Sequence, residues 1–352
     1  MASVVIAGAG LAGRLFAWAL ARGGHAVTVC DAAAGPEPKL DGTGAAAFAA
    51  AGMLSPLAEQ EQGGAQVAAL GWQSLALWPD IVRALPGQVP FRQSGSLLLA
   101  HRSDLGAAER ALAHMPGAQL LDAAALAALE PTLAPGLRAW HLPGEGHIAP
   151  IAAMAGLHAG APAVDWHWGA GVEAVHPGEL RLHGGRRITA DWAIDARGLG
   201  AGPALPLRGV RGEIVTLSLP GHGLRRPVRL LHPRHRVYIV PRTEDEIAVG
   251  ASEIESEDRS PVSLRTAVEL MAAAHSVLPA LAEARILRLD RHLRPALPDN
   301  LPQAHAEPGL LRLNGLYRHG WLLAPALVEQ LLSRAGLGTL AQSPASLLAS
   351  PP

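Results

Sequence analysis

The chain has 352 residues, of which 49% are hydrophobic and 17% are charged. This composition can fill a sizeable core and excludes general disorder, and the length suits two domains. The formal net charge of −1 excludes a broad basic surface for nucleic acid or for an anionic membrane. A single cysteine, Cys30, excludes an intrachain disulfide and a cysteine-rich metal site, and we expect no metal.

The start of the chain runs from Met1-Ala2-Ser3 directly into an apolar segment, without the basic stretch and cleavage pattern of a secretory signal. Glycine, proline or charge interrupts every apolar run before the length of about 18 residues that a membrane span needs. We therefore expect a soluble, cytoplasmic protein with no membrane or nucleic-acid partner. The sequence leaves a homo-oligomer open.

The first 31 residues predict a strand, a glycine-rich turn, a helix and a second strand that ends on an acid. Val4, Val5 and Ile6 form a continuous apolar run, which is typical of a buried parallel strand. A glycine turn over residues 8–13 follows, then an amphipathic helix over 14–22 and a strand over 25–29. This order is that of a dinucleotide-binding βαβ unit.

Each glycine of the turn has a physical role in such a unit. Gly8 permits the tight turn, Gly10 lets the backbone approach a pyrophosphate, and Gly13 lets the helix pack close to the strand. Asp31 follows at about the spacing expected of an acid that binds a ribose hydroxyl. NAD and FAD both carry that hydroxyl, so the motif leaves the choice between them open. The plainer interpretation is a glycine-rich turn in a chain rich in alanine and glycine.

Later segments resemble the glycine oxidase and D-amino-acid oxidase family of flavoenzymes. Residues 49–56, rich in alanine and glycine, resemble the family's loop beside the flavin ring. Further similarities follow in the family's order at residues 192–198, 208–213, 293–302 and 315–325. The resemblance extends to about residue 335 and implies that the dinucleotide is FAD, held non-covalently.

This resemblance implies an α/β fold, in which a Rossmann-type FAD-binding domain is interleaved with a smaller α+β substrate domain that contains an antiparallel sheet. The FAD-binding domain would comprise residues 1–85, 147–205 and 298–340; the substrate domain would comprise 86–146 and 206–297, and 341–352 would be a frayed tail. Local patterns predict strands at 96–100, 228–231, 237–240 and 246–250, and helices at 104–114 and 263–275, the latter capped by Ser263.

By the same resemblance, Arg294 would clamp the carboxylate of an amino acid and Tyr238 would offer it a hydroxyl. Arg318 would be a second arginine near the pocket mouth. Each has an ordinary alternative: a surface arginine in a loop, a strand tyrosine with a solvated hydroxyl, and an arginine at the start of a helix.

Other polar residues are less specific. His232, His235 and His319 could handle protons, but a chain with 16 histidines favours none of them. Arg225, Arg226, Arg229, Arg234 and Arg236 form a local basic cluster, interpreted as a solvated face or a pocket wall.

The FAD-binding residues implied by the motif and by the resemblance are drawn from six segments. They are Gly8, Gly10, Leu11, Ala12, Gly13, Asp31, Ala51, Gly52, Met53, Val172, Gly198, Arg318, His319, Gly320 and Leu322.

The implied reaction is oxidation of a small amine or a glycine-like amino acid, in which hydride passes from the α-carbon to flavin N5. Oxygen would then reoxidise the flavin and give H₂O₂, and the imine could serve thiamine biosynthesis. One alternative is an amine oxidase or dehydrogenase acting on sarcosine, a D-amino acid or a modified amino acid. Another, of a different class, is an FAD-binding partner protein without turnover.

Overall fold

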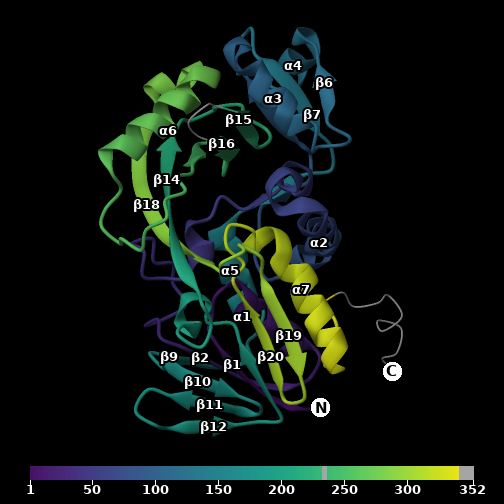
Figure 1. Cartoon of the computed structure of the whole chain (residues 1–352), viewed down its shortest axis with the longest axis vertical. Helices are drawn as coiled ribbons and strands as arrows, with labels where there is room; N and C mark the ends of the chain where they lie inside the picture. The colour runs from purple at the N-terminus through teal and green to yellow at the C-terminus, as the bar shows by residue number, and fades with distance from the viewer. Residues whose placement is uncertain (232–235, 341–352) are drawn as a thin grey trace.

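The computed structural model describes residues 1–231 and 236–340, and its two large sheets lie in opposite halves of the molecule (Figure 1). The six-stranded sheet is parallel except for β19, which pairs antiparallel with β20. Its strands, in spatial order, are β19 (Gln303–Glu307), β20 (Leu310–Asn314), β13 (Trp192–Asp195), β1 (Ser3–Ala7), β2 (Ala26–Asp31) and β9 (Asp165–Trp168).

Residues 4–7 of strand β1 are apolar because both faces of the strand are covered. Val4 and Ile6 face helices, and in register Ile6 lies opposite Val29 and Ile194. Val5 and Ala7 pack instead against a small antiparallel sheet. The helices are α1 (Leu11–Arg22), α2 (Pro56–Ala84), α5 (Pro150–Ala159) and α7 (Gly320–Ala335); the small sheet contains β10 (Val172–His176), β11 (Glu179–Leu182) and β12 (Arg187–Thr189). The predicted buried parallel strand is thus confirmed.

Two local predictions need correction at the start of the chain. The helix predicted as amphipathic over 14–22 begins at Leu11, and every residue from 11 to 20 is buried. It packs against α5 and α7 as well as the sheet, so it has no broad solvent face. The following strand, predicted over 25–29 and to end on an acid, spans Ala26–Asp31, so it begins one residue later than predicted and ends on Asp31 as predicted.

The second large sheet has eight strands and is antiparallel apart from the β15–β5 pair. In spatial order the strands are β18 (Arg285–Ala296), β14 (Arg208–Ser218), β17 (Glu246–Gly250), β16 (Arg236–Pro241), β15 (Val228–Leu231), β5 (Ser96–Ala100), β7 (Arg138–Leu142) and β6 (Gln119–Leu121). Helix α6 (Leu264–Val277) covers one face, while α3 (Leu105–Leu112) and α4 (Ala123–Leu129) flank the far end (Figure 1).

The strands predicted in this region are confirmed, and so is the cap of α6, where the Ser263 hydroxyl accepts the Thr266 N–H at 3.2 Å. The helix predicted over 104–114 is shorter, because residues 102–104 form a 3₁₀ turn before α3 begins. The other 3₁₀ turns are η1 (Ala46–Ala49), η3 (Gly198–Ala201) and η4 (Pro279–Glu283).

Sheet membership supports the proposed two-domain division, since each large sheet draws its strands from only one set of the proposed segments. A three-stranded sheet joins the sets: β3 (Met53–Leu54), β8 (Gly146–Ile148) and β4 (Phe91–Arg92). The predicted frayed tail, 341–352, lies outside the described residues. Across the described ranges, no helix is both long and apolar enough to span a bilayer.

Candidate active site

A cavity of about 1220 Å³ is lined by residues of both large sheets and by the starts of α1 and α7. Its lining extends from the glycine turn after β1 to Tyr238 and Arg294 in the eight-stranded sheet. All of the predicted site residues line it except Gly13. The sequence therefore identified residues that are distant along the chain but share one cavity.

The three glycines of the turn have different surroundings. At Gly8 (φ +99°) a Cβ atom would lie 2.5 Å from the Ala196 carbonyl oxygen, and at Gly13 it would lie 1.8 Å from the Gly8 carbonyl oxygen. At Gly10 the nearest neighbour would be Ala45 Cβ, 3.8 Å away. Gly8 and Gly13 thus permit close packing, whereas Gly10 keeps space open beside the cavity.

The start of α1 is arranged to receive an anion. Its N-cap, Gly10, offers no side-chain cap, and the first turn contains no acid, so the helix N–H groups keep a net positive end toward the cavity. Asp31 holds the adjoining backbone: its Oδ2 accepts the Ala9 N–H at 2.6 Å and its Oδ1 accepts the Ala33 N–H at 2.7 Å.

The small-residue loop crosses the cavity wall in a fixed position. Gly52 (φ +70°) passes so close to Ile148 that a Cβ atom would lie 2.1 Å from the Ile148 carbonyl oxygen. Arg242 donates to the carbonyls of Ala50 (2.7 Å) and Ile148 (3.5 Å), and burial lowers the pKa of its guanidinium to about 10. Arg242 was not predicted to contact this loop. It directly follows β16, and its partner Ala50 lies 192 positions earlier in the chain.

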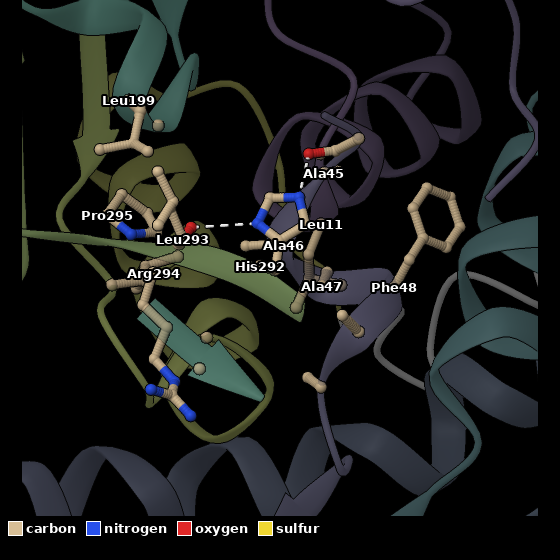
Figure 2. A pocket seen from close by; sticks show the side chains of 18 of the residues that line it. Leu11, Ala45, Ala46, Ala47, Phe48, Leu199, His292, Leu293, Arg294 and Pro295 are labelled. Carbon is tan, nitrogen blue, oxygen red and sulfur yellow. Dashed lines mark hydrogen bonds between the residues drawn. The ribbon is translucent and has the colours of Figure 1, made fainter. Parts of the chain in front are cut away.

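The same loop is fixed at its other end. His292 hydrogen-bonds the Gly44 carbonyl, and Trp321 Nε1 donates to the Ala47 carbonyl at 3.1 Å. Figure 2 shows the two walls that meet here: residues 45–48 on one side and the end of β18, with Leu293, Arg294 and Pro295, on the other.

The start of α7 is a second uncapped helix N-terminus on the cavity. His319, its N-cap, provides no side-chain cap, and Gly320 and Leu322 line the cavity beside it. The His319 side chain is buried, and its Nδ1 has no hydrogen-bond partner in the part of the chain that the structure describes. A buried, unpartnered ring nitrogen on a cavity wall indicates that a bound group completes its hydrogen bonding.

The remaining predicted cofactor positions lie between these two helix ends. Val172 accepts a hydrogen bond on its carbonyl from Arg197 (3.0 Å), whose guanidinium also pairs with Asp195. The Gly198 N–H donates to Asn314 Oδ1 at 2.8 Å. An elongated cavity with two positive helix ends, an acid and a small-residue loop fits a flavin dinucleotide.

Arg14 is a buried residue that the sequence predicted only as part of an amphipathic helix. Its guanidinium donates to the carbonyls of Ala9 (2.9 Å), Met154 (2.7 Å) and Pro36 (2.9 Å). Burial lowers its pKa to about 10, although Asp31 opposes this shift. Arg14 thus ties the glycine turn to α5 and to the loop after β2.

At the other end of the cavity, Arg294 has a charge that no carboxylate of residues 1–231 or 236–340 neutralises. It donates to the carbonyls of Ser252 (3.0 Å) and Arg211 (3.5 Å), and among the described residues it forms no ion pair. Gly212 makes room for it, since a Cβ atom there would lie 2.4 Å from the Arg294 Cζ.

Tyr238 is near this arginine and is held in the same way. A Cβ atom at Gly250 would lie 2.6 Å from the Tyr238 hydroxyl oxygen, so only glycine fits opposite it. Burial raises the pKa of Tyr238, and Arg294 partly opposes the shift. The hydroxyl therefore stays protonated and can donate a hydrogen bond.

Arg318 differs from Arg294 because two carboxylates already hold it. It forms a close ion pair with Glu59 and a second one with Glu253 at 3.2 Å. Glu59 also contacts Arg229 (3.1 Å) and His319 (3.0 Å). Burial alone would raise the pKa of Glu59, but Arg318 and Arg229 hold it well below its usual range.

Glu59 and Glu253 were not predicted as site residues, and Arg229 was predicted only within a basic cluster interpreted as a solvated face or a pocket wall. Glu59 occurs in the first turn of α2, where an acid is usual for electrostatic reasons alone. In the predicted basic cluster, Arg229 forms part of the cavity wall, whereas Arg226 is buried against Glu130 at 3.2 Å and is not on a solvated face. His232, Arg234, His235 and the side chain of Arg236 lie outside the described residues.

Comparisons with known proteins agree with this geometry. The family described as FAD dependent oxidoreductase (DAO) matches residues 3–333. The "Putative thiamine biosynthesis oxidoreductase ThiO" of Rhizobium etli is 40% identical over 333 residues, which is 94% of this chain and 95% of that protein. The glycine oxidase of Geobacillus kaustophilus is 27% identical over 94% of this chain and 93% of its own length.

Solved structures show the same fold. The crystal structure of the Geobacillus kaustophilus glycine oxidase matches with a TM-score of 0.80 and 26% identity, over 95% of this chain and 94% of that one. That of iminodiacetate oxidase from Chelativorans matches with a TM-score of 0.78 and 24% identity, over 98% of both chains. The chain therefore belongs to the family of FAD-dependent oxidoreductases, and its cofactor is FAD.

Proposed function

We propose that this protein oxidises glycine, or an amino acid of similar size, to the corresponding imino acid. The observation that carries the proposal is the unneutralised guanidinium of Arg294 on the cavity wall, near the buried hydroxyl of Tyr238. A charge at that position is matched by the carboxylate of a small substrate.

Arg294 and Tyr238 would bind that carboxylate together. The guanidinium offers two parallel donors to the carboxylate, and the protonated tyrosine offers one more. Both side chains are held by packing against glycines, so they are in place before substrate arrives. Fixing the carboxylate orients the α-carbon toward the small-residue loop.

FAD would be held by the two helix ends and the glycine turn. We assign to it Gly8, Gly10, Leu11, Ala12, Asp31, Ala51, Gly52, Met53, Val172, Gly198, His319, Gly320 and Leu322, all of which line the cavity, with Gly13 behind them. We propose that the attachment is non-covalent, since Cys30 is buried where β2 pairs with Ala7 of β1.

The reaction removes a hydride from the α-carbon and a proton from the amine, which leaves a C=N double bond. FAD, when bound, would supply the hydride acceptor, and O₂ would take up the two electrons with two protons to give H₂O₂. The amine binds uncharged, so the protein residues need only orient the substrate and exclude water. Water then hydrolyses the free imine to a 2-oxo acid and ammonia, unless another enzyme uses it first. The name of the Rhizobium etli relative supports a place for that imine in thiamine biosynthesis.

The test is anaerobic reduction of the purified, FAD-loaded protein by glycine, sarcosine and D-alanine in turn. We expect glycine to bleach the visible flavin band and air to restore it with release of H₂O₂. Bleaching that only an artificial acceptor reverses would make the protein a dehydrogenase. A yellow protein that none of the three reduces would refute the proposed substrate class.

A further inference from the structure

Glu253 is the most exposed acid of a cluster of charged side chains on the cavity wall. This charged cluster comprises Glu59, Arg229, Glu253, Arg318 and His319. Its side chain is 49% exposed and pairs with Arg318 at 3.2 Å. The Tyr317 hydroxyl also interacts with the Glu253 carboxylate; burial and then this interaction raise the pKa of Tyr317 to about 12, so the hydroxyl remains protonated. Glu253 is therefore held in place on the cavity wall by two neighbours.

The segment that carries Glu253 lies between the two candidate substrate arginines. The Ser252 carbonyl accepts from Arg294 at 3.0 Å, and the next residue, Glu253, pairs with Arg318. The backbone N–H of Tyr317 donates to the Pro295 carbonyl at 2.8 Å, which brings the Arg318 turn close to Arg294. A ligand held by Arg294 is thus next to the outer side of Arg318, which is the side that faces Glu253.

Of Arg229, Arg294 and Arg318, only Arg294 lacks an ion pair among the described residues. Arg229 and Arg318 are balanced by Glu59 and Glu253, and Arg294 is left without an acid among the described residues. A substrate with one carboxylate and an uncharged amine completes this balance. A substrate with a second carboxylate would bring an anion toward Glu253, and repulsion between like charges in a partly desolvated site costs affinity.

We propose that Glu253 is a specificity-determining residue, which occupies the outer side of Arg318 and so excludes amines that carry a second carboxylate. Iminodiacetate, which is glycine with a carboxymethyl group on its nitrogen, is one such amine. The inference rests on the proposed amino-acid oxidation for the position of the first carboxylate. Glu59 cannot take this role, because its carboxylate is buried on the inner side of the cluster.

The experiment compares Glu253→Gln with Glu255→Gln in the FAD-loaded enzyme. Glu255, two residues further along the same segment, is 64% exposed and pairs with Arg208 at 2.9 Å, outside the cavity lining. Each variant removes one negative charge from the same loop. We expect Glu253→Gln to raise the ratio of kcat/KM for iminodiacetate to that for glycine about tenfold, mainly through KM, and Glu255→Gln to leave the ratio unchanged.

A binding measurement separates this inference from the proposed function. Calorimetric titration gives the affinities for malonate and acetate. The ratio of malonate affinity to acetate affinity should rise about tenfold in Glu253→Gln and stay unchanged in Glu255→Gln. If no variant oxidises glycine but Glu253→Gln still raises the affinity for malonate relative to acetate, the proposed function fails and the role of Glu253 stands. If both ratios match those of Glu255→Gln, the role of Glu253 is overturned.

Tyr317→Phe provides a second variant should Glu253→Gln fail to retain FAD. Loss of the hydroxyl releases one of the two contacts that hold the Glu253 carboxylate. We expect a smaller gain for malonate over acetate, about threefold, and no gain in this variant would count against the inference.

Discussion

The two ends of the cavity are built from different materials. At the FAD end, backbone groups dominate: glycines that permit close approach, two uncapped helix ends and a loop of small residues. At the substrate end, ionised side chains from α2, β15, β18 and the turn before α7 face one another. The FAD end should therefore be sensitive to added volume, and the substrate end to removed charge.

The largest expected effect comes from added volume at the glycine turn. Gly13→Val should abolish FAD binding and destabilise the fold by about 3 kcal/mol or more, because its Cβ would overlap the Gly8 carbonyl. Gly10→Val should fold with an apo stability within about 1 kcal/mol of wild type but bind FAD at least tenfold more weakly. Flavin absorbance per protein and thermal unfolding measure both effects.

This pair also tests whether the two glycines have separate roles. Equal loss of stability in both apo proteins would mean that the space beside Gly10 is needed for folding. Full FAD content in Gly10→Val would contradict its assignment to the cofactor.

At the substrate end, Arg294→Ala should lower kcat/KM for glycine about 10²–10³-fold while the protein keeps its FAD. The reason is loss of a charge-assisted clamp worth about 3–4 kcal/mol. Arg291→Ala is the matched control, because Arg291 lies on the same strand, donates to the Arg259 carbonyl and does not line the cavity. Similar steady-state losses in both variants would mean that β18, rather than the guanidinium, had been disturbed.

The difference between the two ends of the cavity also explains which site residues could be predicted from the sequence. Gly8, Gly10, Gly13 and Asp31 follow one another within a single βαβ unit, so their spacing alone indicates their geometry. Ser263 was identified as a helix cap for the same reason, since its partner is only three residues away. Local structure of this kind can be predicted because the residues that determine it lie within one short segment.

The charged cluster could not be predicted because its contacts are non-local. Glu59 meets Arg318 across 259 positions of sequence, and Arg242 reaches Ala50 across 192. Each of these residues looks ordinary in its own segment. Arg14 shows the same limit. An arginine in a short helix predicts a solvent-exposed face, but in the structure its guanidinium is buried and donates to three backbone carbonyls outside the helix's own hydrogen-bond pattern.

Glu59 and Glu145, two buried glutamates near Arg229, should respond oppositely to pH. Glu59→Gln should cost about 3–5 kcal/mol at pH 7, because it leaves Arg229 buried without its anion and Arg318 with Glu253 alone. The pKa of Glu59 is depressed, so its contribution is present above the unfolded value of 4.5 and is lost as pH falls through the folded value. The deficit of the variant should therefore shrink in acid.

Glu145 provides the contrast, because burial raises its pKa although Arg229 opposes the shift. Its stabilising contribution is present below 4.5 and is lost as pH rises through the folded value. Glu145→Gln should match wild type near pH 4.5 and exceed it at higher pH. Urea midpoints measured from about pH 2.5 to 8 test both signs, and parallel curves for the two variants would contradict them.

The smallest effect should come from the tyrosine that shares the carboxylate with Arg294. Tyr238→Phe removes one hydrogen-bond donor and keeps the ring that packs against Gly250, so we expect KM for glycine to rise about five- to tenfold with kcat nearly unchanged. Because burial raises the pKa of Tyr238 above 10, the ratio of wild-type to variant kcat/KM should stay constant between pH 7 and 9.5. A ratio that declines over this range would show that the hydroxyl ionises there, and that the charge of Arg294 influences Tyr238 more than its burial does.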